Sequence, residues 1–189
     1  MPTSADTTGL ILAGGQSRRF GQDKALAELG GVSFVALVYA ALAAHADTVL
    51  IATGPTPRPY PVSARVVLDP VAGGGPVAGL AAGLNAAATS WLLTAAVDLP
   101  YLTPSALCPL AAARLGSADV FVAHADGHRQ PTCALWRVQA VTPVVRELIR
   151  ETFGTRGPSL RYLLSQLVVQ EVTLESGSLR NVNRSGDLT

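Results

Sequence analysis

The stretch GLILAGGQSRRFGQDKALAEL, which spans Gly9 to Leu29, decides which fold this chain can adopt. Its first four residues are apolar and predict a buried β-strand, which the adjacent glycines Gly14 and Gly15 end. The loop that follows carries three positive side chains: Arg18, Arg19 and Lys24. Glycine lets the backbone approach a ligand closely, while arginine and lysine bind phosphate oxygens. The stretch therefore predicts a strand whose carboxyl end carries a polyphosphate-binding loop.

The spacing of this loop differs from that of two common phosphate-binding motifs. In a P-loop the lysine directly follows a glycine, whereas here Gln22 and Asp23 separate Gly21 from Lys24. The GxGxxG motif of dinucleotide-binding folds does not fit either, because the glycines before the basic segment are adjacent. Taken by themselves, these residues leave open a solvated basic loop that binds nothing.

Composition indicates one compact domain over residues 1–189, with 49% apolar and 14% charged residues. The net charge of +1 argues against a general nucleic-acid binder, so an anion site has to be local. The two cysteines, Cys108 and Cys133, stand outside any CxxC or Cys/His cluster, which argues against a zinc site. We expect both to be reduced core thiols in the cytoplasm.

The amino-terminal segment and the apolar runs favour a cytoplasmic location. The start, MPTSADTTGLILAGG, has no basic region and too short an apolar stretch for a signal peptide. Uninterrupted apolar runs stay below the roughly 20 residues that a membrane span needs. We therefore expect neither a membrane nor a nucleic acid among the partners.

The remainder of the chain predicts strands that alternate with helices. Predicted strands cover 48–53, 64–69, 91–98, 118–124, 132–136 and 168–174, and predicted helices cover 32–46, a segment from Pro76, 103–116, 138–152 and 159–167. Asp126-Gly127 is a turn signal that predicts an antiparallel hairpin. We expect an α/β fold with a mostly parallel twisted sheet, helices on both faces and a small antiparallel hairpin.

Two aspartates end predicted strands on the side where such sheets bind ligands. Asp98 ends the strand 91–98, and Asp69 ends the strand 64–69 just before Pro70. Ligands of open α/β sheets bind beyond the carboxyl ends of the strands, which is also where the basic loop lies. Mg²⁺ prefers one or two carboxylates together with phosphate oxygens and water. Each aspartate alone is equally explained by turn capping, but together with the basic loop they favour a metal-bound polyphosphate.

Five sequence blocks in a fixed order resemble a known family. They are LAGGQSRRFGQDK, GPVAGL, VDLPYL, RQPTCALW and LRNVNRSGDL. Each block alone is weak, but the ordered set covers nearly the whole chain. The chain resembles the molybdenum cofactor guanylyltransferases, which build the molybdopterin guanine dinucleotide cofactor. The resemblance implies a Rossmann-like nucleotidyltransferase fold.

The resemblance also implies roles for individual residues. GTP would lie over Leu12, Ala13, Gly14 and Gly15, with Lys24 on its phosphates, Asp69 and Thr53 on its nucleoside, and Asp98 on Mg²⁺, for which Mn²⁺ is an alternative. The pterin side would include Arg129, Gln130, Asn181 and Asn183. Gly14 stands where wider nucleotidyltransferases often have alanine, and in this family that glycine accompanies guanine.

This sequence departs from the family pattern at three places. Phe20 replaces the usual methionine, Thr53 replaces a frequent asparagine, and residues 154–162 match the family's basic loop only loosely. The departure at Thr53 puts its contact with the nucleoside in doubt.

The implied reaction is attack by the terminal phosphate of molybdopterin on the α-phosphorus of GTP, with release of pyrophosphate. Arg19, Lys24 and Asp98 are the implied catalytic residues, because such transfers need positioning and charge stabilisation more than a protein nucleophile. GTP and molybdopterin would be the small-molecule partners, with room for transient contact with other cofactor-biosynthesis proteins or molybdoenzymes.

Two alternatives remain open at this point. One is a molybdopterin cytidylyltransferase or another small nucleotidyltransferase. The other is a non-catalytic nucleotide-binding partner protein, which would bind the nucleotide without releasing pyrophosphate.

Overall fold

A computed structural model describes residues 6–14, 23–71, 73–151, 157–183 and 187. Its centre is a seven-stranded sheet in the order β5-β4-β1-β6-β8-β7-β9. The strands are β1 (Thr7–Leu12), β4 (Thr48–Ala52), β5 (Arg65–Val67), β6 (Trp91–Ala96), β7 (Val120–Ala125), β8 (His128–Arg137) and β9 (Val169–Thr173). All side chains of β1 and β6 are buried, as expected of central strands that are covered on both faces.

The sheet is parallel except for one strand. β5, β4, β1 and β6 pair in parallel, and β9 pairs in parallel with β7, whereas β8 runs antiparallel to both β6 and β7. The β7–β8 turn has positive φ angles at Asp126 (53°) and Gly127 (78°), as a type I′ turn requires. The prediction of a mostly parallel sheet with an antiparallel hairpin is confirmed.

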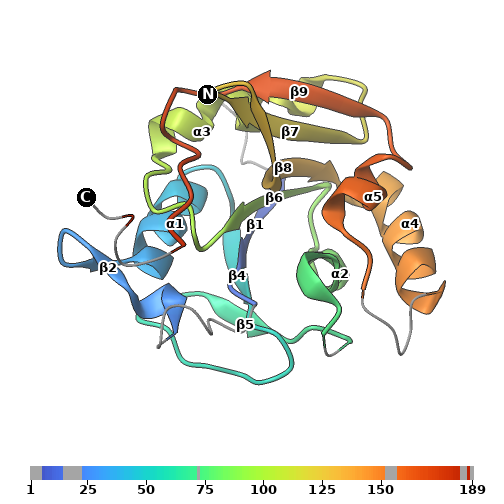
Figure 1. Cartoon of the computed structure of the whole chain (residues 1–189). Coiled ribbons are helices and arrows are strands. Elements are labelled where there is room, and N and C mark those ends of the chain that lie inside the picture. Colours follow the sequence, from blue (N-terminus) through green and yellow to red (C-terminus); the bar gives the residue numbers. More distant parts are fainter. Residues whose placement is uncertain (1–5, 15–22, 72, 152–156, 184–186, 188–189) are drawn as a thin grey trace.

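Helices cover both faces of the sheet (Figure 1). One apolar cluster joins the sheet to α1 (Phe34–Ala43) and α3 (Pro104–Ala112), and a second joins it to α2 (Gly75–Ala86), α4 (Val138–Glu151) and α5 (Leu160–Leu164). The structure also contains two short 3₁₀ turns, η1 (Lys24–Leu26) and η2 (Ala113–Leu115). Within the described residues, no helix combines the length and the apolar character needed to cross a bilayer.

The predicted helix over 32–46 is shorter than expected. Val32 and Ser33 form β3 and pair with β2 (Glu28–Leu29), so that the helix begins at Phe34. Gly30 and Gly31 have φ angles of 60° and 81°, which allow the tight turn between these short strands. The glycine pair thus indicates a hairpin, although the apolar residues that follow it favour a helix.

The strands predicted over 64–69 and 91–98 are shorter than expected and do not include Asp69 and Asp98. β5 stops at Val67 and β6 at Ala96, so Asp69 and Asp98 each lie two residues beyond the ladder. Loop positions free a side chain from the alternation of a strand, so these two carboxylates are not fixed to one face of the sheet.

The expectation of two core thiols holds for one cysteine only. Both cysteines are free; Cys133 is buried whereas Cys108 is exposed. Burial raises the pKa of the Cys133 thiol to about 12, so that it stays protonated and inert.

Candidate active site

The carboxyl ends of the parallel strands meet in one place because their registers coincide. Leu12 at the end of β1 is paired with Ala52 of β4 and Ala96 of β6. Beyond the ladder, the Ala13 N–H donates to the Ala52 carbonyl at 2.9 Å, and the Val97 N–H donates to the Leu12 carbonyl at 3.1 Å. The segment that opens the basic loop is thereby fixed between the strands that lead to Asp98 and to Thr53.

Lys24 lies at the centre of the site. Its Nζ is 3.4 Å from Asp98 Oδ2 and donates to Asn183 Oδ1 at 2.8 Å. The side chains of Lys24 and Asp98 are only 15% and 23% exposed, so water screens this charge pair less than it screens a surface pair. Residues from the first, middle and last parts of the chain thus form one polar cluster.

Two carboxylate oxygens at these strand ends are buried without a hydrogen-bond partner among the described residues, Asp98 Oδ1 and Asp69 Oδ1. A buried carboxylate oxygen that accepts no hydrogen bond is costly and uncommon. Such an oxygen is suited to a cation or to a donor group on a ligand. Both orphaned oxygens lie at the edge where the sequence predicts the nucleotide.

The Asp69 carboxylate lies next to two glycines, Gly14 and Gly79. A Cβ atom on Gly14 would be 3.4 Å from Asp69 Oδ2 and from the Gly54 nitrogen, and one on Gly79 of α2 would be 3.6 Å from Asp69 Oδ1. Contacts of 3.4 Å are ordinary van der Waals contacts, so protein packing alone does not require glycine at position 14. Its absent side chain instead leaves space beside Asp69 Oδ2. Burial raises the pKa of this carboxyl, and a backbone hydrogen bond from Gly54 partly opposes the rise.

The other residues predicted to contact the nucleotide have buried side chains. Leu12 and Ala13 are 8% and 6% exposed, so a ligand would meet their main chain rather than their side chains. Thr53 is buried, and its hydroxyl donates to the Thr56 carbonyl at 3.0 Å. Its hydroxyl proton is therefore engaged within the loop that follows β4.

On the predicted pterin side, one residue, Asn183, contacts Lys24, and two others, Gln130 and Asn181, contact each other. Gln130 Nε2 donates to Asn181 Oδ1 at 2.6 Å, and Asn183 accepts from Lys24. Between the two asparagines, the Val182 N–H donates to the Asp98 carbonyl at 2.9 Å, and the Val182 side chain is fully buried. The carboxyl-terminal segment 181–183 is thereby fixed to the end of β6.

Arg129 points away from Gln130. It pairs with His124 in the β7–β8 ladder, whereas Gln130 pairs with Ala123, so the two side chains point to opposite faces of the sheet. Arg129 instead forms an ion pair with Glu171 of β9. Gly15, Arg18 and Arg19 lie outside the described residues.

Sequence reasoning missed two residues next to the basic loop, Arg58 and Tyr60. Both lie in the proline-rich loop between β4 and β5 and both donate to Asp23 Oδ2, Arg58 at 3.0 Å and Tyr60 at 3.4 Å. Burial and the nearby Asp23 carboxylate raise the pKa of Tyr60 to about 12. The sequence offered no spacing signal for this contact, because the partners are 35 and 37 positions apart.

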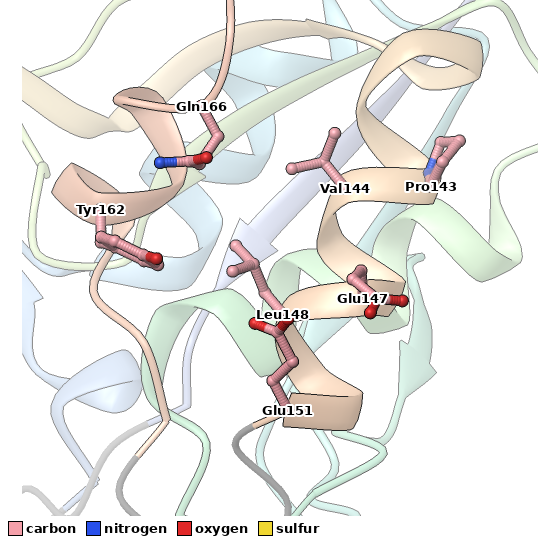
Figure 2. A pocket seen from close by; sticks show the side chains of 7 residues that line it. All are labelled: Pro143, Val144, Glu147, Leu148, Glu151, Tyr162 and Gln166. Atoms are coloured by element: carbon pink, nitrogen blue, oxygen red, sulfur yellow. The ribbon is translucent and has the colours of Figure 1, made fainter.

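A separate hollow of about 440 Å³ lies between α4 and the α5 region. Figure 2 shows Glu147, Leu148 and Glu151 on the α4 side, opposite Tyr162 and Gln166. None of the predicted site residues lines it, so this hollow is distinct from the cluster around Lys24.

Residues 9–170 match the MobA-like NTP transferase domain family. A probable molybdenum cofactor guanylyltransferase from Mycobacterium avium is 31% identical, over 100% of this chain and 96% of that protein. The molybdenum cofactor guanylyltransferase of Rhodobacter capsulatus is 40% identical over 70% of each chain.

Solved structures share the fold at lower sequence identity. Molybdopterin-guanine dinucleotide biosynthesis protein A from Archaeoglobus fulgidus superimposes with a TM-score of 0.74 at 21% identity, covering 96% of this chain and 94% of that one. A 2-C-methyl-D-erythritol 4-phosphate cytidylyltransferase from Thermus thermophilus gives a TM-score of 0.69, also at 21% identity, with the same coverage of both chains. The fold alone therefore does not select the nucleotide. The chain belongs to the MobA-like NTP transferase family and stands among its molybdenum cofactor guanylyltransferases, which makes it a nucleotidyltransferase.

Proposed function

We propose that this enzyme transfers GMP from GTP to the terminal phosphate of molybdopterin. An oxygen of the molybdopterin phosphate forms a bond to the α-phosphorus of GTP, the bond from that phosphorus to the β-phosphate oxygen breaks, and pyrophosphate leaves. The observation that carries the proposal is the contact of Lys24 with both Asp98 and Asn183, because it joins the predicted nucleotide side to the predicted acceptor side.

The nucleotide would lie across the segment Leu12–Gly15, with Asp69 and Thr53 toward the nucleoside. The half-buried Asp69 carboxylate, with one oxygen lacking a hydrogen-bond partner among the described residues, suits N–H or O–H donors of a base or a ribose. The missing Cβ of Gly14 leaves space beside Oδ2, the other oxygen of that carboxylate. The curated relatives, which are named molybdenum cofactor guanylyltransferases, support GTP as that nucleotide.

Lys24 and Arg19 would stabilise the charge that collects on the departing pyrophosphate. Phosphoryl-type transfer depends on positioning and on electrostatic stabilisation, which a lysine and an arginine supply without a covalent intermediate. Lys24 is suited to this role because its ammonium group is already held in a partly buried position by two acceptors.

Asp98 would hold the metal ion, which we propose to be Mg²⁺ with Mn²⁺ able to replace it. The described residues contain no group of three or more His, Cys, Asp or Glu side chains that could enclose a metal. One carboxylate with an orphaned oxygen instead matches an ion that completes its shell with phosphate oxygens and water. When bound, such an ion supplies positive charge to the phosphate oxygens.

Gln130, Asn181 and Asn183 would face molybdopterin, since amide groups can both donate to and accept from a pterin ring. Arg129 would contribute only if it left its ion pair with Glu171 and turned toward the face on which Gln130 lies. The cytoplasmic location and transient contacts with other cofactor-biosynthesis proteins or molybdoenzymes stay predictions.

The decisive experiment measures pyrophosphate release from each of the four nucleoside triphosphates, with molybdopterin and Mg²⁺. We expect release from GTP that depends on both molybdopterin and the metal. Faster release from CTP would favour a cytidylyltransferase, and nucleotide binding without release would favour a non-catalytic partner protein.

A further inference from the structure

The turn that carries Lys24 is too short to be rigid on its own. η1 contains only Lys24–Leu26, and isolated turns of this length are marginal in water. Asp23 caps the turn, since its Oδ1 accepts from the Ala25 N–H at 3.1 Å and its carbonyl accepts from the Leu26 N–H at 3.0 Å. The direction in which Lys24 leaves the backbone therefore depends on how well Asp23 is held.

Asp23 is held by the loop between β4 and β5. Its second oxygen, Oδ2, accepts from Arg58 Nη1 at 3.0 Å and from the Tyr60 hydroxyl at 3.4 Å. The Asp23 side chain is 19% exposed, whereas that of Arg58 is 41% exposed. The two oxygens of one carboxylate thus serve different partners, one within the turn and one across the loop.

The loop that provides Arg58 is itself anchored at several points. Tyr60 packs against the apolar cluster beneath α1. At its start, the Thr53 hydroxyl donates to the Thr56 carbonyl, and the Gly54 carbonyl accepts from the Asp69 N–H at 3.1 Å. Arg58 therefore contacts Asp23 from an anchored loop, so the position of this loop determines the position of the Asp23 carboxylate.

We propose that Arg58 is a positioning residue for Lys24: it fixes the Asp23 carboxylate, and Asp23 fixes the turn that directs Lys24 Nζ toward Asp98 and Asn183. This inference rests on the proposed function and deepens it. Among the described residues, Arg58 pairs with Asp23 and not with Lys24 or Asp98, so we expect its loss to act through the geometry of Lys24. Because Lys24 acts on charge that develops during the reaction, misplacing it lowers kcat more than it changes the KM for GTP.

The kinetic test compares Arg58→Ala with Arg58→Lys and with a control, Arg65→Ala. Arg65 is an exposed arginine on β5, and among the described residues its guanidinium donates to the Ala86 carbonyl and not to Asp23. We expect Arg58→Ala to lower kcat about 10-fold with a KM for GTP within about 2-fold of wild type. Arg58→Lys keeps a cation beside Asp23 and restores most of kcat, while Arg65→Ala matches wild type.

A double variant separates positioning from general destabilisation. If Arg58 acts through Lys24, Arg58→Ala changes kcat by less than about 2-fold once Lys24 is already alanine. An undiminished 10-fold loss in the Lys24→Ala background, or a kcat that falls only in step with the melting temperature, overturns the proposal.

A second measurement does not depend on turnover. We expect the amides of Ala25, Leu26 and Ala27 to exchange with solvent faster in Arg58→Ala than in wild type or Arg65→Ala, as measured by NMR. Unchanged exchange there overturns the inference. Should wild type release no pyrophosphate from GTP, the proposed function fails while this exchange measurement still decides whether Arg58 fixes the turn.

Discussion

The Lys24 ammonium is shared between a carboxylate and an amide oxygen, 3.4 Å from Asp98 Oδ2 and 2.8 Å from Asn183 Oδ1. Two unit charges about 4 Å apart attract by about 4 kcal/mol at an effective dielectric constant of about 20. Asp98 therefore holds Lys24 firmly, yet it keeps a second oxygen without a hydrogen-bond partner among the described residues. One carboxylate can thus position the lysine and still hold a cation.

Replacing either member of this pair is expected to disable the reaction. Lys24→Ala and Asp98→Ala should each lower the rate of pyrophosphate release by about 10²-fold or more, as losing a preorganised electrostatic group does in other enzymes. The measurement is turnover of GTP with molybdopterin, in variants whose melting temperature matches wild type. Rates close to wild type in both variants would end the proposed mechanism.

Asp69 links stability to pH because burial raises its pKa above the ordinary value of 3.8. Below that value the carboxyl is protonated in both the folded and the unfolded state and has no effect. As the pH rises toward the raised folded-state pKa, the unfolded state ionises first, so the ionised group increasingly disfavours the fold. The cost is complete once the pH exceeds the raised pKa.

Asp69→Asn should therefore gain stability relative to wild type as the pH rises. We expect the difference in unfolding free energy between the variant and wild type to be more favourable at pH 7 than at pH 4, measured by urea denaturation. We also expect Asp69→Asn to weaken GTP binding, because the amide keeps only one acceptor oxygen and carries no charge. A stability difference that stays constant with pH would show that Asp69 is not buried as described.

At the scale of elements, periodicity predicted the parallel sheet and its covering helices because these depend on local sequence. The β2–β3 hairpin was missed, since Val32 and Ser33 continue an apolar run that also suits a helix. The residues of the candidate site likewise fall into those that local sequence predicts and those that only the tertiary fold brings together. Lys24 and Asp98 could be predicted because each follows a strand toward the same edge, whereas Arg58 meets Asp23 only through the tertiary fold.

Contact between two loops at the start of α2 depends on glycine. A Cβ atom on Gly157 would lie 2.3 Å from the Gly74 carbonyl oxygen, far inside van der Waals contact with backbone. Gly157→Ala should therefore destabilise the protein by about 1–3 kcal/mol, in the range of overpacked sites. Each kcal/mol lowers the melting temperature of a protein of this size by about 2–4 °C.

Gly14→Ala is the matched control for this prediction. Its Cβ would find only contacts of 3.4 Å or longer, so its melting temperature should stay that of wild type. Equal melting temperatures in Gly157→Ala and Gly14→Ala would mean that the loop containing Gly157 can move away from α2 without cost.

At the scale of the whole molecule, the two faces of one sheet contribute side chains to two apolar clusters. Ile11 of β1 packs on the α1 and α3 side, while its neighbours Leu10 and Leu12 pack on the α2 and α4 side. Trp91 belongs to the first cluster and Trp136 to the second. If the sheet unfolds, the apolar side chains of both clusters become exposed to water. We therefore expect the chain to unfold as one cooperative domain.

The two tryptophans allow this to be measured face by face. Trp136→Phe leaves Trp91 to report on the first cluster, and Trp91→Phe leaves Trp136 to report on the second. Within each variant, we expect the urea midpoint from fluorescence to coincide with that from far-UV circular dichroism, because both probes follow one transition. Comparing probes inside the same variant cancels any destabilisation by the substitution itself, which matters for the fully buried Trp136. Midpoints that separate in either variant would divide the molecule into two units, and the site, whose residues span both ends of the chain, would then form only after they dock.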